Sequence, residues 1–173
     1  LAEDADIDIQ TSKAWINIME TLGIILLLHP YSNNVLKRTI KTPKVYFYDT
    51  GLVCYLTRWS SPEVAESGAM SGALLENFTV SEIMKSYQNA GLEPYLYFYR
   101  DRDAKEIDVI LEGDGKLCPL EIKKTATPDR RLTRVFNVID RSPLQLGTGA
   151  VLCMADKFSA FDSNNLIVPI WMI

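Results

Sequence analysis

The sequence predicts an α/β fold of the α+β type, in which helices flank a mixed sheet. Two amphipathic stretches with helical periodicity lie at about 72–90 and 129–141. Short runs rich in β-branched and aromatic residues lie between and after them, at about 95–100, 106–112, 117–124, 150–154 and 166–172. The predicted order of elements in this part of the chain is therefore αβββαββ.

The first of these helices carries one carboxylate in line with an apolar stripe. It is predicted to begin after Ser71 and to close at Gly91. Glu76 shares a face with three apolar residues at helical spacing, Val80, Ile83 and Tyr87. Glu76 would therefore approach the sheet if this helix packs over it.

The strands at 106–112 and 117–124 are predicted to form a hairpin. The dipeptide Asp114-Gly115 suits a two-residue turn, because both central positions need positive φ. In the resulting register Asp108 faces Glu121. Strict alternation along the first strand would put Asp108 on one face with Ile110, and Ile107 on the other with Val109.

Two facing carboxylates need an explanation. Their Cβ atoms would be about 5 Å apart, and two full charges at that separation repel by roughly 3 kcal/mol at an effective dielectric constant of about 20. Protonation of one carboxylate, a neighbouring cation such as Lys123, or a divalent metal would relieve this repulsion. The spacing of Glu121 and Lys123 suits a metal ligand beside a cation that stabilises a phosphate oxygen. The alternative is an ordinary cross-strand ion pair between Glu106 and Lys123, with both other carboxylates in solvent.

The helix predicted at about 129–141 has an apolar side and a basic side. The residues expected to face inward are Leu132, Val135, Phe136 and Ile139. The residues expected on the other side are Arg130, Arg134, Asn137 and Arg141. Arg130, Arg131 and Arg134 are candidate contacts to a nucleic-acid backbone, and the alternative is a solvated face.

The first 60 residues are interpreted as the end of a winged-helix unit. A helix at 11–22, capped by Thr11 or Ser12, is followed by strands at 24–29 and 45–48. Three basic residues between these strands resemble a wing that contacts DNA phosphates, namely Lys37, Arg38 and Lys41. The alternative for the whole segment is a helix and a hairpin that only pack against the main domain. The alternative for the three basic residues is a solvated loop. Residues 57–71 are expected to be a loop, with the main domain at 61–173.

The composition excludes several classes of function. The chain has 173 residues and a net charge of −4, so overall charge gives no nucleic-acid signature. Its three cysteines are isolated from one another, without the spacing of a zinc site or a disulfide framework. The single histidine, His29, excludes a histidine-based triad within this chain. No signal peptide or bilayer-spanning apolar run is visible, so we expect a cytoplasmic protein without membrane contact.

Three stretches resemble a known family. They are TPKVYFYDTGLVCYL at 42–56, GALLENFTVSEIMK at 72–85, and YLYFYRDRDAKEIDVILEGDGKLCPLEIKK at 95–124. They resemble the DUF4143 domain of prokaryotic ATPases of the AAA type, which is similar to the PD-(D/E)XK nuclease superfamily. The resemblance implies a nuclease-like fold after a winged-helix-like remnant. The partners it implies are DNA and an ATPase domain upstream, since this chain contains no GxxxxGK[ST] motif and starts without Met.

The resemblance also implies roles for particular residues. Asp108 matches the central metal-binding aspartate of nucleases, and Glu121 with Lys123 matches the (D/E)XK pair. Glu76 matches the helix glutamate that completes such sites, and the carbonyl of Ile122 is a further metal contact. The implied cofactor is Mg²⁺ or Mn²⁺, and the implied activity is cleavage of phosphodiester bonds. Ile107 stands where the superfamily name expects proline, and inactive members that only bind are the alternative.

Overall fold

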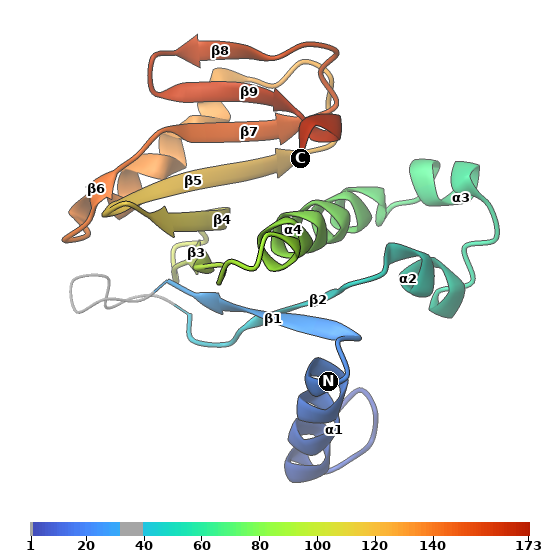
Figure 1. Ribbon diagram of the computed structural model, residues 1–173. Helices are drawn as coiled ribbons and strands as arrows, with labels where there is room; N and C mark the ends of the chain where they lie inside the picture. The colour runs from blue at the N-terminus through green and yellow to red at the C-terminus, as the bar shows by residue number, and fades with distance from the viewer. Residues whose placement is uncertain (1, 32–39) are drawn as a thin grey trace.

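The structure is a computed structural model that describes residues 2–31 and 40–173. Within these residues a nine-stranded sheet has the strand order β2-β1-β3-β4-β5-β7-β9-β8, with β6 paired to β5 (Figure 1). Helices flank this mixed sheet, which confirms the predicted α+β class. The strands are β1 (Ile25–Pro30), β2 (Lys44–Phe47), β3 (Leu96–Arg100), β4 (Glu106–Gly113), β5 (Lys116–Lys123), β6 (Gln145–Leu146), β7 (Gly149–Cys153), β8 (Ser159–Asp162) and β9 (Asn165–Pro169).

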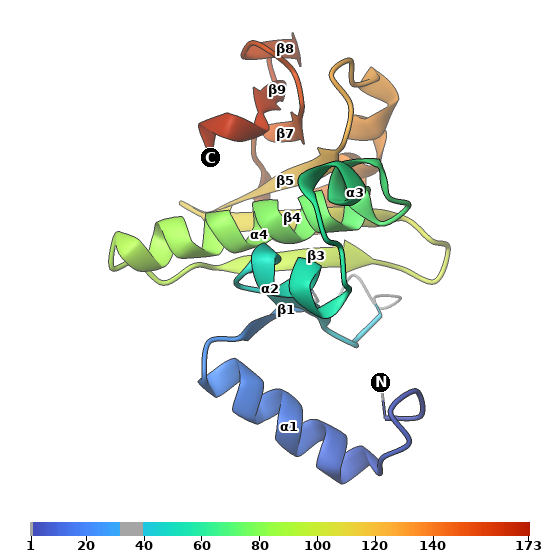
Figure 2. The same cartoon turned by 90° about the vertical axis from the view of Figure 1, so that its right-hand side faces the viewer.

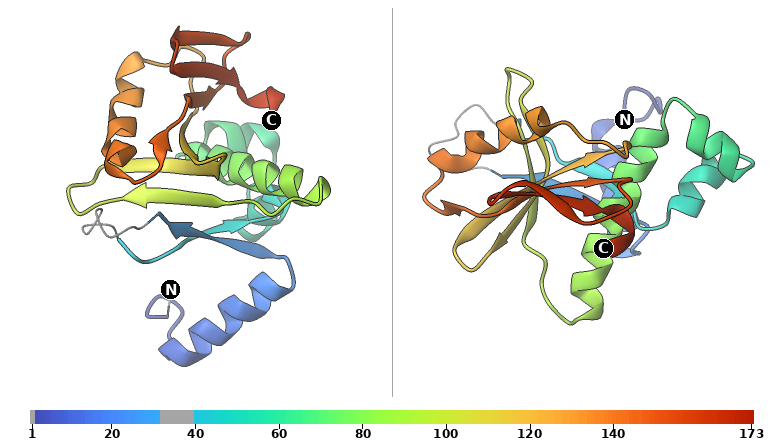
Figure 3. Two further views of the ribbon diagram at one scale, coloured as in Figure 1. Left: turned by 60° about the vertical axis from the view of Figure 1, so that its left-hand side comes forward. Right: turned by 90° about the horizontal axis from the view of Figure 1, so that it is seen from above.

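The helices cover both faces of the sheet. The α-helices are α1 (Ile9–Thr21), α2 (Thr50–Leu56), α3 (Pro62–Ser67) and α4 (Ser71–Asn89), and the 3₁₀ helices are η1 (Arg130–Arg141) and η2 (Ile170–Met172). Figure 3 shows α4 and η1 on opposite sides of the sheet. No helix among the described residues is long and apolar enough to cross a bilayer.

The β4–β5 hairpin forms as predicted. Asp114 and Gly115 both have positive φ, at 50° and 72°. The ladder runs from Gly113 opposite Lys116 to Val109 opposite Leu120. The turn therefore sets the register that brings β4 and β5 together beside Asp108.

A β-bulge at Asp108 overturns the predicted alternation along β4. Tyr97 pairs with Ile110 and Tyr99 pairs with Ile107, so one residue of β3 faces two residues of β4. As a result Ile107 and Ile110 pack into the same core, whereas Val109 packs into the other. Bulges of this kind often re-aim a side chain next to an active site.

Two hydrophobic cores hold these layers together. The core under α4 includes Leu26, Leu28, Val80, Ile83, Phe98, Val109, Leu120, Ile122, Ala150 and Leu152. The core under η1 includes Tyr31, Tyr99, Ile107, Ile110, Leu117, Phe136 and Ile139. The sheet thus buries apolar side chains on both faces, which fixes the positions of the polar groups at its strand ends.

The segment predicted as an amphipathic helix at 129–141 is a 3₁₀ helix with a three-residue repeat. Its buried residues are Thr133, Phe136 and Ile139, whereas the exposed Arg131 and Arg134 lie on other sides. Arg130 is exposed too, at the start of the row that the buried residues continue. Leu132 and Val135 were expected to face inward and are only half-buried. The prediction assumed 3.6 residues per turn, but a 3₁₀ helix has 3.0.

The N-terminal helix begins earlier than predicted. Asp8 caps α1 by accepting hydrogen bonds from the backbone N–H of Gln10 and Thr11, so Thr11 and Ser12 are not the caps. None of the α1 residues is buried, and Trp15 is 56% exposed. Figure 2 shows α1 apart from the main body, next to β1.

Three further elements differ from or refine the predicted outline. Asp49 caps α2, with its Oδ1 2.7 Å from the backbone N of Gly51. The expected loop at 57–71 contains α3, which Ser61 caps. Strand β8, which pairs with β9 at the edge of the sheet, was not predicted.

The hairpin of β1 and β2 belongs to the same sheet as the rest of the chain. β1 runs parallel to β3 over two residue pairs, and β2 lies at the outer edge. The buried Asn77 of α4 holds β2, because its side chain bonds both the N–H and the carbonyl of Phe47 at 2.8 Å. The winged-helix interpretation of residues 1–60 and the boundary at 60/61 stay predictions.

The Asn77 contact is expected to be a main anchor of β2. Replacing Asn77 with Ala removes two hydrogen bonds and should destabilise the protein by about 2 kcal/mol, since each contributes about 1 kcal/mol. Urea unfolding measures this loss. Asn89→Ala on the exposed end of the same helix is the control and should change stability by less than about 0.5 kcal/mol. Equal effects of the two substitutions would contradict the assignment.

Candidate functional site

Four carboxylates and two lysines gather where β2, α4, β4 and β5 meet. Glu76 comes from α4, Glu106 and Asp108 from β4, and Glu121 from β5. Lys44 comes from β2 and Lys123 from β5. We call these six residues the carboxylate–lysine cluster.

The Lys44 ammonium lies among three carboxylates of the cluster. Its Nζ is 2.6 Å from Glu106 Oε1, 3.0 Å from Glu76 Oε1 and 3.9 Å from Asp108 Oδ1. The same Nζ lies 5.4 Å from the centre of the Phe98 ring. Burial alone would lower the pKa of Lys44, but the three carboxylates outweigh burial and raise it. Lys44 is therefore charged and neutralises part of the cluster.

Tyr46, two residues along β2, adds a hydroxyl to the cluster. Its O–H donates to Glu76 Oε1 at 2.6 Å. Burial, followed by the nearby Glu76 charge, raises the pKa of Tyr46, so it remains a neutral donor. Lys44 and Tyr46 thus hold the same oxygen of Glu76.

Asp108 is the most strongly perturbed carboxyl group of the cluster. It is only 7% exposed, and its Oδ2 accepts a hydrogen bond from the backbone N of Ile122 at 2.8 Å. Burial, followed by the charges of Glu121 and Glu76, raises the pKa of Asp108 to about 7. The Ile122 hydrogen bond and Lys44 oppose that rise. Burial and the two neighbouring carboxylates together thus favour the protonated form of Asp108.

Glu121 and Lys123 form an ion pair along β5. Lys123 Nζ lies 2.9 Å from Glu121 Oε1, and Glu121 is 8% exposed. Burial raises the pKa of Glu121 although Lys123 opposes it. For Lys123, burial lowers the pKa, but Glu121 outweighs this and the net pKa is raised. The four residues predicted to form the site thus interact electrostatically, namely Glu76, Asp108, Glu121 and Lys123.

The alternative to the metal site, an ion pair between Glu106 and Lys123, does not form. Glu106 bonds Lys44 and lies opposite Arg100 in the ladder, with Arg100 Nε 3.6 Å from its Oε2. Lys123 instead turns to Glu121, its neighbour on the same strand. The β4–β5 ladder ends at Val109 and Leu120, before Glu106 and Lys123, and beyond it Asp108 accepts a hydrogen bond from the backbone N of Ile122.

The donor set fits a hard divalent cation at two carboxylates. Asp108 and Glu121 are buried oxygen ligands with raised pKa values, and a cation between them would relieve their repulsion. Within the described residues, however, no group of three or more acidic, histidine or cysteine side chains is arranged to hold a metal ion. Glu76 and Glu106 are already held by Lys44.

A cavity of about 480 Å³ opens beside Lys44, Tyr46, Glu76 and Glu106. Its other walls include apolar residues of α2 and α4, among them Val53 and Leu74, and Met70 just before α4. The cavity gives a ligand access to the Lys44 side of the cluster.

The predicted basic residues lie elsewhere. Arg130 pairs with Asp162 and Arg131 pairs with Asp129, both at 2.7 Å, and Arg134 lies on the same 3₁₀ helix. Lys41 is exposed. Lys37 and Arg38 lie outside the described residues.

Sequence reasoning missed Lys44 and Tyr46. Their spacing of two along β2 places both side chains on one face of the strand, and this was the available signal. The spacing could not show that this face of β2 packs against α4, because Tyr46 and its partner Glu76 are 30 residues apart in the sequence.

Comparison with known proteins places the chain in a family. Residues 71–173 match a family described as a domain of unknown function, DUF4143, and residues 1–63 match another such domain, DUF8612. The uncharacterized proteins Mb2031c of Mycobacterium bovis and Rv2008c of Mycobacterium tuberculosis share 30% identity over 170 residues. The alignment covers 98% of this chain but 37% of each relative. No solved structure matches. The chain belongs to the DUF4143 family.

Proposed function

We propose that the carboxylate–lysine cluster cleaves phosphodiester bonds in nucleic acid with the help of a divalent metal. The observation that supports this most is the pair of buried carboxyl groups beside a lysine, with the pKa of Asp108 at about 7. Such perturbed carboxyl groups cluster at functional sites. The proposal thus rests on two arguments: the sequence resemblance to PD-(D/E)XK nucleases, and the buried environment of the residues that carry it.

Each residue of the cluster has a role in this proposal. Asp108 and Glu121 would hold Mg²⁺ or Mn²⁺, with the carbonyl of Ile122 as a further contact. The bound metal would neutralise phosphate charge and lower the pKa of a coordinated water. Lys123 would donate to a phosphate oxygen as negative charge develops there. Glu76 would act as an outer residue that fixes Lys44.

The proposed partners follow the same reasoning. The substrate is nucleic acid, with DNA favoured, and Lys37, Arg38 and Lys41 would contact its phosphates. An ATPase domain upstream in the same polypeptide, which the resemblance implies, would be the second partner. We place the protein in the cytoplasm, where the unpaired Cys54, Cys118 and Cys153 stay reduced.

A cleavage assay tests the proposal. The purified protein is expected to cleave single- or double-stranded nucleic acid with Mn²⁺ or Mg²⁺. Asp108→Ala and Lys123→Ala should each lower the rate at least about 100-fold, the usual cost of removing one electrostatic contact to the transition state. Lys116→Ala, at the exposed hairpin turn, is the control and should retain activity. The absence of cleavage of every DNA and RNA form would count against the proposal.

A second function is favoured by the position of Lys44. A resident ammonium among three carboxylates neutralises charge that a metal would otherwise neutralise. The module would then be an inactive nuclease-like fold that binds a protein or DNA and regulates an attached ATPase. Calorimetry with Mg²⁺ and Mn²⁺ separates the two functions, because only the first requires metal binding that Asp108→Asn abolishes.

A further inference from the structure

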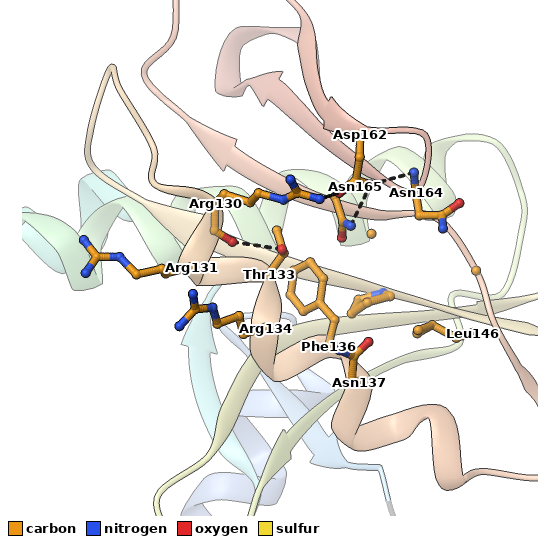
Figure 4. Close-up of a pocket in the computed structure, with 13 residues that line it drawn as sticks. Arg130, Arg131, Thr133, Arg134, Phe136, Asn137, Leu146, Asp162, Asn164 and Asn165 are labelled. Carbon is orange, nitrogen blue, oxygen red and sulfur yellow. Dashed lines mark hydrogen bonds and ion pairs between the residues drawn. The ribbon is translucent and has the colours of Figure 1, made fainter.

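A second cavity, of about 460 Å³, lies between η1 and the turn from β8 to β9 (Figure 4). Three arginines of η1, Arg130, Arg131 and Arg134, contribute to its walls. Asn164 of the β8–β9 turn and Asn165, the first residue of β9, line it as well. It shares no lining residue with the carboxylate–lysine cluster, so its chemistry can be considered separately.

The floor of this cavity is tightly packed. A Cβ at Gly149 would lie 2.6 Å from a ring carbon of Phe136, and a Cβ at Gly147 would lie 2.5 Å from Cys118 Sγ. No side chain larger than hydrogen fits at either position without displacing its neighbour. Glycine at these two positions therefore leaves room for the neighbouring Phe136 and Cys118 side chains.

Two of the arginines are held in place by aspartates. Arg130 donates to Asp162 Oδ2 at 2.7 Å, and Asp162 in turn accepts from Asn164 and Asn165 at 2.9 Å. Arg131 donates to Asp129 through two nitrogens, at 2.7 and 3.0 Å. These bonds orient the two guanidinium groups but use only part of their five donors.

Arg134 has a different environment. Within the part of the chain that the structure describes, it forms no ion pair. Figure 4 shows Arg131 and Arg134 extending to the same side of η1, while Arg130 reaches toward Asp162. The lining residues carry three positive charges and the one negative charge of Asp162. Asp129, which binds Arg131 from outside the lining, reduces the net charge of these groups to +1.

We propose that this cavity binds the phosphate monoester of a nucleotide, either free or at the end of a nucleic-acid strand. Guanidinium groups match phosphate oxygens in charge and geometry. A monoester carries close to two negative charges at neutral pH, more than a diester does, so the positive lining attracts it more strongly. The volume suits a ligand about the size of one nucleotide rather than a duplex. The one aromatic lining residue, Phe136, is only 2% exposed and offers no stacking surface, so binding depends on phosphate more than on base identity.

Anisotropy titrations in EDTA test this without requiring cleavage. The ligands are one labelled oligonucleotide with a 5′-phosphate, a 3′-phosphate or neither, and AMP and inorganic phosphate are competitors. A terminal phosphate should tighten binding at least tenfold, and Arg134→Ala should remove that difference. Arg102→Ala, an exposed arginine in the turn between β3 and β4, is the matched control and should bind like the wild type.

The outcomes separate the sources of the phosphate and the two proposals. If AMP binds as tightly as the phosphorylated oligonucleotide, a free nucleotide is sufficient as the ligand. If AMP binds more weakly, the ligand is the phosphorylated end of a strand. Asp108→Asn should bind normally in this assay even though it disables the proposed cleavage. Equal binding with and without a terminal phosphate, no binding at all, or an unchanged preference in Arg134→Ala would each overturn the proposal.

Discussion

Replacing Asp108 with Asn is expected to stabilise the fold at pH 8 while it abolishes the proposed cleavage. The pKa of Asp108 is raised from 3.8 to about 7, so the folded protein holds this proton more tightly than the unfolded chain does. The contribution of Asp108 to stability is therefore most favourable below about pH 4 and is lost as pH rises toward 7. At about 1.4 kcal/mol per pKa unit, the loss amounts to about 4 kcal/mol.

Asn resembles the protonated carboxyl group and avoids this loss. Its side-chain oxygen can still accept the hydrogen bond from Ile122. We expect Asp108→Asn to stabilise the protein by about 3 kcal/mol at pH 8 and by almost nothing at pH 4. Urea unfolding at both pH values measures this difference, with the exposed Glu93→Gln as the control. A variant that is no more stable than wild type at pH 8 would show that the carboxyl group is not under strain.

Replacing Lys44 with Met is expected to have a comparable effect in the opposite direction. Met keeps much of the packing against Phe98 but removes the ammonium from Glu76, Glu106 and Asp108. Removing one partner of a largely buried ion pair typically costs about 3 kcal/mol or more. We therefore expect a loss of about 3 kcal/mol at pH 8, measured by urea unfolding.

A divalent cation should recover part of this loss. Mn²⁺ can neutralise the carboxylates that Lys44 leaves behind, so it should raise the melting temperature of Lys44→Met more than that of wild type. Lys41→Met, just before β2 and exposed, is the control for removal of a lysine. If Lys44→Met and Lys41→Met unfold at the same urea concentration, Lys44 does not neutralise the cluster in solution.

The part of the site that sequence predicted well depends on local rules. A two-residue turn at Asp114-Gly115 fixes the register of β4 and β5, and this register follows from turn chemistry alone. The helical position of Glu76 also follows from a local repeat. Family resemblance then linked these positions to a common chemistry.

The part that sequence missed depends on contacts between distant segments. Lys44 enters the cluster because β2 packs against α4, and no periodic pattern encodes that pairing. The bulge at Asp108 arises from the mismatch between β3 and β4, which alternation within one strand cannot reveal. The three-residue repeat of η1 was hidden because its apolar residues also fit a helix of 3.6 residues per turn.

The origin of Lys44 has a consequence for dividing the protein. The two family matches meet between residues 63 and 71, yet the ammonium lies on the first side and its carboxylate partners on the second. A shortened protein that begins at residue 71 would lack Lys44, so Glu76 and Glu106 would lose the ammonium that pairs with them in the 173-residue chain. Its metal affinity and its stability would then describe the severed fragment rather than the intact chain.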